Sequence, residues 1–330
     1  MSAADAPKQL TFSLLRQLAD GEFHSGELLA RNFGVTRATV NNALRDVESY
    51  GLALYSVRGR GYRLARPLQW LNEDLIMDSL GNARDELKIE ILDHAASSNA
   101  LLLQRATRGA VSGNVLAVEW QTAGRGRLGR TWYSGLGDAL TFSLLWRFES
   151  GLAALSGLSL AVGVGMMRAL HELGVAGAGL KWPNDVLLNE GKLAGILLEA
   201  QGDMLGPSAV VIGIGLNLTV PEVLRGRIDQ ATSDLASLEI PMPERNAVLA
   251  VTLKHLAAVL HDFAESGFAP LRREWEDGHV FQQRLVKMLL PDGSQIFGRV
   301  LGVTDEGVLR LATEQGEQLF NAGEVSLRSA

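Results

Sequence analysis

The stretch from Val115 to Trp146 reads VLAVEWQTAGRGRLGRTWYSGLGDALTFSLLW, and it decides the fold of the central part of the chain. An apolar run leads into a loop that alternates glycine and arginine, and a second apolar run follows at Ala139–Trp146. This pattern predicts a strand, a loop and another strand. Glycine lets backbone N–H groups approach a ligand closely, and arginine suits phosphate and carboxylate groups. We therefore expect the loop to close over an anion.

Two common nucleotide-binding motifs do not explain this loop. Gly124, Gly126 and Gly129 match the spacing of the dinucleotide fingerprint, but that fingerprint requires a helix directly after the glycines. Here residues 131–137 are turn-like and lead into the second apolar run. The chain also has no G-x-x-x-x-G-K-[ST] sequence, so a P-loop is not supported. A solvated arginine and glycine hairpin, or a loop that binds nucleic acid nonspecifically, remains an alternative for the loop taken alone.

The composition is that of a globular protein with two or three domains. The chain has 330 residues, of which 47% are hydrophobic, so it is long enough to bury a sizeable core. It contains no cysteine, which excludes disulfides, thiolate metal ligands and a cysteine nucleophile. No uninterrupted apolar run reaches the roughly 18 residues of a membrane span, and no signal-peptide core precedes the first helical pattern. We expect a cytoplasmic protein that does not enter a membrane.

The first 66 residues differ in charge from the rest of the chain. They carry nine Lys and Arg against six Asp and Glu, a net charge of +3, and the net charge of −6 for the whole chain leaves −9 for the remainder. Apolar residues recur at helical spacing over 8–20, 25–33 and 36–50, with Thr36 as the N-cap of the third helix. Three helices with a basic balance are therefore expected before residue 51.

The third of these helices has polar and basic side chains on its outer face, and an arginine-rich hairpin follows at residues 52–64. We expect Ala38 and Val40 to face inward. The outer residues are of the types that contact phosphates and base edges. This arrangement predicts a winged helix–turn–helix that binds DNA, and the alternative is a small helical interaction module with a solvated face. The predicted DNA-binding residues are Arg37, Thr39, Asn41, Asn42, Arg45, Arg58 and Arg60.

Four motifs carry a resemblance to a known family. They are GRGRLGR at 124–130 with Gln121 before it, KWPND at 181–185, KLAGI at 192–196 and GIGLN at 213–217. In this order they resemble the ligand-binding motifs of biotin protein ligases. With the N-terminal unit included, the resemblance covers essentially the whole chain and extends to the bifunctional ligases that also repress biotin operons.

The resemblance implies an α+β protein of three domains. Residues 1–66 would form the winged helix–turn–helix, residues 67–275 an α/β ligase domain with a mixed sheet like that of class II synthetases, and residues 276–330 an SH3-like β-barrel. The sequence agrees at both junctions. Pro67 follows the basic hairpin, and from Leu285 onward short alternating runs are separated by Asp-Gly, Glu-Gly and Gln-Gly turns, a pattern typical of a small antiparallel barrel.

The same resemblance implies the reaction. These ligases activate biotin with ATP to biotinyl-5′-adenylate and transfer biotin to a lysine of the biotin carboxyl carrier protein, an acetyl-CoA carboxylase subunit. This reaction needs no protein nucleophile, but it needs cations that neutralise a carboxylate and the α-phosphate that it attacks. Biotin, ATP and Mg²⁺ are the implied ligands. The implied repressor is a homodimer that forms with the adenylate and binds operator DNA.

The resemblance also assigns roles to residues of this sequence. Arg127, Lys192 and Asp185 would be the catalytic groups, and Mg²⁺ would lie near Asp185 or Asn217. The biotin-binding residues would be Ser97, Ser98, Asn99, Gln121, Gly124, Arg125, Gly126, Arg127 and Lys192. The ATP- and adenylate-binding residues would be Arg127, Trp132, Lys181, Asn184, Asp185 and Asn217.

Other interpretations remain open from the residues alone. Ser97, Ser98 and Asn99 are ordinary helix-capping residues, and Ser98 stands where the family has threonine. Lys192 taken alone is a solvent-exposed lysine after a turn. Two alternatives concern the whole protein: a lipoate or octanoate ligase, and a biotin-sensing DNA-binding regulator without ligase activity.

Overall fold

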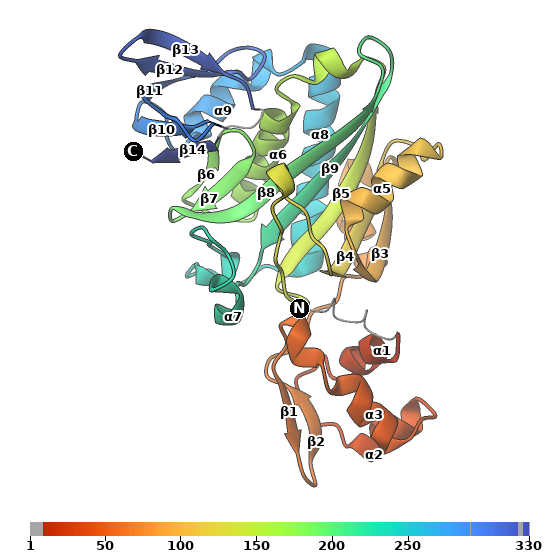
Figure 1. The fold of residues 1–330 in the computed structure, drawn as a ribbon. Coiled ribbons are helices and arrows are strands. Elements are labelled where there is room, and N and C mark those ends of the chain that lie inside the picture. The colour runs from red at the N-terminus through yellow and green to blue at the C-terminus, as the bar shows by residue number, and fades with distance from the viewer. Residues whose placement is uncertain (1–8, 291, 323–325, 330) are drawn as a thin grey trace.

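A computed structural model describes residues 9–290, 292–322 and 326–329 of the chain. Figure 1 shows a small helical unit formed by the N-terminal residues, a large sheet with helices on both faces, and a smaller sheet formed by the C-terminal residues. The arginine-rich loop belongs to the large sheet, which therefore positions the candidate site.

The N-terminal unit consists of three helices and a two-stranded antiparallel hairpin. Ser25 and Thr36 cap the second and third helices, and each hydroxyl accepts a backbone N–H three residues on at 3.1 Å. The third helix ends at Leu44, short of the predicted end, because the chain leaves helical geometry and forms a separate 3₁₀ turn at Val47–Tyr50. The elements are α1 (Gln9–Gln17), α2 (Gly26–Asn32), α3 (Arg37–Leu44), β1 (Leu54–Val57) and β2 (Gly61–Leu64).

Seven strands in the order β3-β4-β5-β9-β8-β7-β6 form the central sheet, in which β3 and β4 are parallel and the other neighbours antiparallel. The prediction of a mixed sheet is confirmed, and the two apolar runs of the opening stretch are its neighbouring strands β4 and β5. The strands are β3 (Lys88–Ala95), β4 (Asn114–Gln121), β5 (Ala139–Phe148), β6 (Ala178–Lys181), β7 (Asp185–Leu188), β8 (Gly191–Gly202) and β9 (Ser208–Asn217).

Helices cover both faces of this sheet (Figure 1). On one face, α5 packs against β4 and β9 through Leu102, Leu116 and Val211. On the other face, α6 and α8 pack against each other and against the sheet, and this side holds the largest hydrophobic cluster. The helices outside the N-terminal unit are α4 (Glu73–Ser79), α5 (Ser98–Thr107), α6 (Leu158–Glu172), α7 (Glu222–Arg225), α8 (Arg245–Ser266) and α9 (Arg272–Gly278).

α8 is the only described helix that is long and apolar enough to cross a membrane. Its 22 residues have a mean hydropathy of 1.4 over the most apolar window, of which 56% is buried within the protein. Leu249, Leu253 and Leu260 have no exposed surface and belong to the central hydrophobic cluster. α8 is therefore accounted for as a core helix of the central layer.

Five antiparallel strands in the order β13-β12-β11-β10-β14 form the C-terminal sheet. Among the described residues the edge strands β13 and β14 do not pair with each other. The prediction of antiparallel strands is confirmed, and the prediction of a closed SH3-like barrel is not. Val286, Val300 and Leu311 continue the central hydrophobic cluster into this sheet, so the two sheets share a core. The strands are β10 (Leu285–Leu289), β11 (Gln295–Val303), β12 (Leu309–Thr313), β13 (Gly316–Phe320) and β14 (Ser326–Ser329).

The segment between the arginine-rich loop and β5 joins the central sheet to the N-terminal unit. Leu136 has no exposed surface and packs within the hydrophobic cluster of the N-terminal helices. Its backbone N–H donates to Tyr50 O at 2.8 Å. Nearby, the buried carboxylate of Asp138 pairs with Arg66, the last residue before Pro67. One end of the ligand loop is therefore anchored in the N-terminal unit.

Candidate functional site

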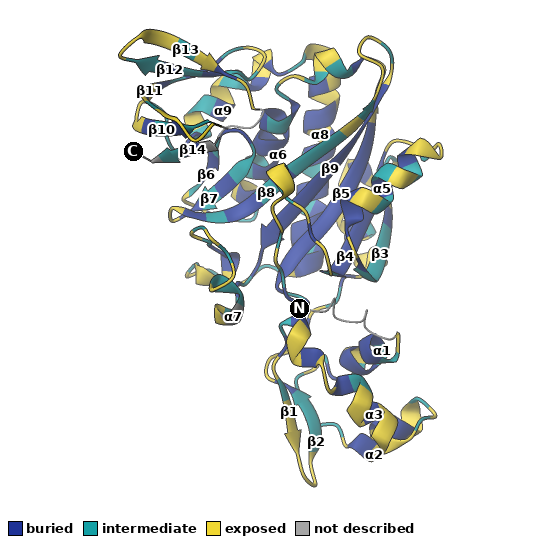
Figure 2. Cartoon of the chain, in the orientation of Figure 1, coloured by how far each residue is buried: buried dark blue, intermediate teal, exposed yellow. Residues whose placement is uncertain are grey.

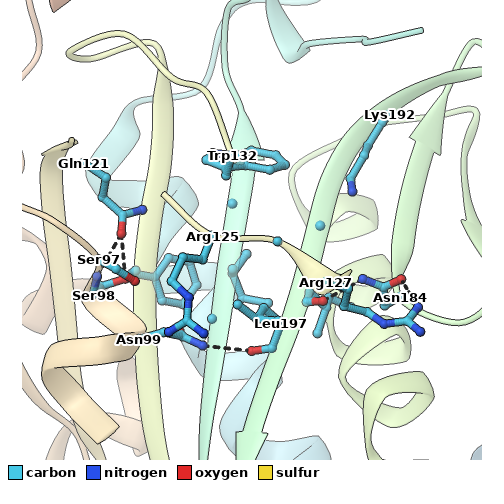
Figure 3. Close-up of a pocket in the computed structure, with 17 residues that line it drawn as sticks. Ser97, Ser98, Asn99, Gln121, Arg125, Arg127, Trp132, Asn184, Lys192 and Leu197 are labelled. Carbon is cyan, nitrogen blue, oxygen red and sulfur yellow. Dashed lines mark hydrogen bonds between the residues drawn. The ribbon is translucent and has the colours of Figure 1, made fainter. Parts of the chain in front are cut away.

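A cavity of about 450 Å³ lies on the central sheet beside the arginine-rich loop (Figure 3). The start of α5, the end of β4, the loop and the strands β8 and β9 contribute to its lining, so segments far apart in the sequence meet there. The structure brings together most of the predicted ligand-binding residues. Those that line the cavity are Ser97, Ser98, Asn99, Gln121, Arg125, Gly126, Arg127, Trp132, Asn184 and Lys192.

Two glycines of β9 make room for side chains that lie flat on the sheet. A Cβ atom at Gly213 would lie 2.1 Å from Asn99 Oδ1, and one at Gly215 would lie 2.4 Å from the ring of Trp132. Neither contact is possible, so any larger residue would displace the side chain above it. The GIGLN motif therefore acts here through the space that its glycines leave open.

One end of the cavity carries uncharged hydrogen-bonding groups beside the ion pair of Arg125 and Glu199. Ser97 caps α5, as its position before the helix indicated. The backbone N–H of Ser98 donates to Gln121 Oε1 at 2.8 Å. Asn99 Nδ2 donates to Leu197 O at 3.2 Å, so the amide is fixed against the neighbouring strand. This end suits a neutral polar ring.

Two residues at this end were not predicted from the sequence. Ser143 Oγ lies 2.6 Å from Asn99 Oδ1 and 2.8 Å from Ser98 Oγ. Glu199 Oε2 accepts a hydrogen bond from Asn99 Nδ2 at 3.1 Å, and its other oxygen pairs with Arg125 Nη2 at 2.9 Å. In the sequence Ser143 is a small residue within an apolar strand, and no local pattern distinguishes it from an ordinary core serine.

The other end of the cavity is cationic. Lys192 Nζ lies 2.7 Å from Asp185 Oδ1 and 5.7 Å from the ring centre of Trp132. Arg127 Nη1 donates to Asn184 Oδ1 at 3.0 Å, and its second terminal nitrogen contacts the carbonyl oxygen of Ala322 in the C-terminal unit. Burial lowers the pKa of Arg127, although the nearby carboxylate of Asp185 opposes this effect. The group stays charged, because arginine ordinarily titrates far above neutral pH.

A second cavity of about 650 Å³ continues from this cationic end. It is lined by Lys181 and Asp185, which were predicted, and by Arg328, which was not. Arg130 also lines it and was predicted only as one of the loop arginines that suit an anion, without a specific ligand. Arg328 comes from the last strand of the C-terminal sheet, and its approach to the site depends on how the two sheets pack.

Among the basic groups of the site, the ammonium group of Lys181 has the most strongly shifted pKa. Burial, followed by the charge of Arg328, lowers its pKa from 10.5 to about 8. The charged form of a buried lysine is penalised because it loses hydration, and a nearby cation adds repulsion. An anion bound in the second cavity would remove much of this penalty.

Two predicted residues lie behind the cavity wall. The carbonyl oxygen of Gly124 accepts the N–H of Trp132 at 2.9 Å and closes the base of the loop. Asn217 is buried at the end of β9, and its amide nitrogen donates to Lys192 O and Ser233 O at 3.1 Å each. Among the described contacts, Asn217 holds the backbone of the segment that carries Lys192. The described residues contain no cluster of three or more His, Asp or Glu side chains that could hold a metal ion.

The predicted DNA-binding surface is exposed throughout (Figure 2). Ala38 is exposed as well, contrary to the prediction that it faces inward, while Val40 is buried. Asn41 Oδ1 accepts a hydrogen bond from Tyr62 of the hairpin at 3.2 Å, which links the third helix to the hairpin. The exposed predicted residues are Arg37, Thr39, Asn41, Asn42, Arg45, Arg58 and Arg60.

The cavity, with its cationic end, suits a ligand that carries a carboxylate group, and the N-terminal helices and hairpin have the order of a winged helix–turn–helix. Comparison with protein families supports each part. The family described as Biotin/lipoate A/B protein ligase family matches residues 94–217, an HTH domain matches residues 11–63, and the Biotin protein ligase C terminal domain matches residues 284–328.

Named relatives give the same result over nearly the whole chain. The bifunctional ligase/repressor BirA of Escherichia coli is 38% identical over 96% of this chain and 97% of its own length. The protein of the same name from Bacillus subtilis is 28% identical over 94% of this chain and 95% of its own. A solved structure of biotin protein ligase from Aquifex aeolicus, in complex with biotin and ATP, superposes with a TM-score of 0.62 and 31% identity, covering 74% of this chain and 99% of that one. The chain belongs to the biotin protein ligase family, among its bifunctional ligase/repressors.

Proposed function

We propose that this chain joins biotin and ATP to biotinyl-5′-adenylate, transfers biotin to a lysine of the biotin carboxyl carrier protein, and represses the genes of biotin synthesis. One observation carries the ligase assignment beyond family membership. The cavity has uncharged hydrogen-bonding groups and the mutually neutralising pair of Arg125 and Glu199 at one end, and Lys192 and Arg127 at the other. A ligand with a neutral polar ring and a terminal carboxylate matches this polarity.

Lys192 is the group proposed to act in activation, and Arg127 is the group proposed to retain the adenylate that forms. The biotin carboxylate and the α-phosphate of ATP would compete with Asp185, whose Oδ1 lies 2.7 Å from Lys192 Nζ, for the ammonium group. A lysine placed between two anions lowers their repulsion and stabilises the charge that develops as they react. Arg127 would hold the adenylate in place. At the ring end, biotin would contact Ser97, Ser98, Asn99, Gln121, Gly124, Arg125 and Gly126.

The nucleotide would extend from the cationic end into the second cavity. Trp132 is proposed to pack over adenine. The nucleotide is also proposed to contact Lys181, Asn184 and Asn217, either directly or through the backbone that these side chains hold in place. The depressed pKa of Lys181 supports an anion at this position, since a bound phosphate would stabilise its charged form.

Mg²⁺ is proposed to enter with ATP. Its preferred ligands are oxygen atoms, and it usually takes several from the phosphates. Asp185 fits this role, because its carboxylate lines the second cavity. Asn217 fits it less well, since its side chain is buried and it lines neither cavity.

The N-terminal unit is proposed to bind operator DNA, and the adenylate-bound chain to act as a homodimer. The support is an exposed face of arginine and short polar side chains of the types that contact phosphates and bases. ATP, the carrier protein and operator DNA are all found in the cytoplasm, so we propose a cytoplasmic location. We retain the domain boundaries 1–66, 67–275 and 276–330 and an SH3-like C-terminal domain as part of the proposal.

Mass spectrometry of the protein mixed with ATP, Mg²⁺ and either biotin or lipoate tests the ligase assignment. We expect a bound biotinyl adenylate. A lipoyl adenylate instead would support the related lipoate ligases, and no adenylate with retained biotin binding would support a regulator without ligase activity.

A further inference from the structure

Ser143 lies behind the ring end of the cavity, against the lining residues Ser98 and Asn99, and has no role in the chemistry proposed above. It is fully buried on β5, next to Asn99 and Ser98. We propose that Ser143 is a positioning residue that fixes the direction of hydrogen bonding at Ser98, and so restricts the ring end to ligands that offer an N–H beside a carbonyl. The inference rests on the proposed function and deepens it, because it assigns a role in ring recognition to a residue outside the proposed binding set.

The orientation of the Asn99 amide follows from its partners. Asn99 Nδ2 lies 3.2 Å from Leu197 O and 3.1 Å from Glu199 Oε2. A carbonyl oxygen only accepts, and the carboxylate of Glu199 is paired with Arg125 at 2.9 Å, so it accepts as well. Two acceptors on one side require the NH₂ group there. Asn99 Oδ1 must therefore face Ser143.

The direction of the next two hydrogen bonds follows from proton counting. A serine hydroxyl has one proton, and Ser143 Oγ lies 2.6 Å from the oxygen of Asn99, which only accepts. Ser143 therefore donates to Asn99. The Ser98 hydroxyl has two acceptors in reach, Ser143 Oγ at 2.8 Å and Gln121 Oε1 at 3.4 Å, and the shorter contact is the stronger hydrogen bond, so Ser98 donates to Ser143. With its proton committed to Ser143, Ser98 offers the cavity only a lone pair.

Gln121 presents the opposite polarity beside Ser98. Its Oε1 accepts the backbone N–H of Ser98 at 2.8 Å, so its amide nitrogen is turned toward the cavity (Figure 3). An acceptor and a donor side by side match the N–H and C=O of a cyclic urea. A dithiolane ring or an alkyl chain offers neither group and would leave buried polar atoms unpaired, which strongly disfavours binding.

We call the hydrogen bonds from Ser98 to Ser143 and from Ser143 to Asn99 the relay. A combination of protein and ligand variants tests it. The ligands are biotin and its two cyclic carbamate analogues, in each of which one ring N–H is replaced by oxygen. The affinity of the full-length protein for each ligand is measured by calorimetry without ATP. The ratio of the affinity for biotin to the affinity for each analogue is then compared between wild type and Ser143→Ala. One of the two analogues should bind the wild type more weakly than the other. For that analogue, we expect the ratio of biotin affinity to analogue affinity to be about tenfold lower in Ser143→Ala than in the wild type. Without Ser143, the Ser98 hydroxyl can rotate and donate to the carbamate oxygen.

Two further variants separate the relay from a general loss of packing. Thr141→Val removes a buried hydroxyl two residues earlier on β5, one that donates to Val118 O at 2.8 Å, and it should leave the ratio unchanged. Ser143→Cys keeps most of the volume, so that a folded variant is obtained if Ser143→Ala is unstable, and its ratio should also fall. If both Ser143 variants have the wild-type affinity ratio and the wild type forms biotinyl adenylate, the role proposed for Ser143 is wrong and the proposed function stands. A wild type that forms no biotinyl adenylate would overturn the proposed function itself.

Discussion

Lys192 combines a carboxylate partner, Asp185, with an aromatic neighbour, Trp132. This arrangement holds the ammonium group in the wall that the two cavities share until an anion replaces Asp185. The energetic role of the residue is therefore electrostatic, and it should be larger in the transition state than in biotin binding.

Replacement of Lys192 by alanine should slow adenylate formation by about 10²–10³-fold, because one preorganised donor to the reacting anions is lost. The affinity for biotin alone should fall much less. Pyrophosphate release in the presence of biotin and ATP measures the rate. Release near the wild-type rate would show that Lys192 does not act on the reacting groups.

Arg127 holds the loop to Asn184 and to the C-terminal unit. Arg127→Gly should still form adenylate but release it, since the loop loses this contact. The freed adenylate should label exposed lysines of unrelated proteins, and more so at raised pH, where more lysine is neutral given its usual pKa of about 10.4. Unchanged specificity for the carrier protein in this variant would count against a retaining role.

Lys181 gives the site a pH dependence. Its pKa of about 8 in the free protein should rise when ATP binds, because phosphate stabilises the ammonium form. ATP binding should therefore take up protons above about pH 8, and affinity should fall as the pH is raised through this value. The stability contribution has the opposite trend. Above pH 8 the unfolded chain, with its pKa of 10.5, binds more protons, so stability from this group rises with pH up to about 10.5.

Calorimetry of ATP binding in two buffers of different ionisation enthalpy measures this proton uptake. Lys181→Met is the matched control, since it retains an apolar chain of similar length and should abolish the uptake. An uptake that persists in Lys181→Met would assign the titration to another group.

The elements of the fold differ in how far the sequence predicts them. β4 and β5 are long apolar runs separated by glycine, so their pairing follows from the local pattern. α3 was predicted too long because apolar spacing continues through Val47 although the helix has already ended at Leu44. The positions of Ser143 and Arg328 depend on tertiary packing that brings distant segments together, and the local sequence holds no signal of it.

The packing of Leu136 against the N-terminal helices affects the outcome that we expect when these helices are deleted. Deletion of residues 1–66 should abolish operator binding and retain ligase turnover, because both cavities are lined by residues after Pro67. Leu136 would lose the cluster that buries it, and it lies four residues after Trp132. We therefore expect weaker binding of biotin and ATP, measured as a raised KM in a biotinylation assay. A truncated protein that cannot biotinylate the carrier even at saturating substrates would contradict the modular account.

The whole molecule combines a ligase with a DNA-binding unit of modest charge. A net charge of +3 on the first 66 residues gives little nonspecific attraction to DNA at physiological salt. A single helix–turn–helix also covers only half of a typical operator, so two copies held at a fixed distance would bind far better. Ordering the ligand loop would favour the dimer, and such coupling is reciprocal and typically about 1–3 kcal/mol.

The central claim is that one adenylate serves both catalysis and repression. Sedimentation with a nonhydrolysable biotinyl adenylate analogue, run beside an operator titration, tests it most directly. We predict that the analogue raises both the dimer fraction and the operator affinity, and that with biotin and ATP an excess of unbiotinylated carrier protein lowers both. A protein that stays monomeric with the analogue and binds its operator equally well with and without it would contradict the account.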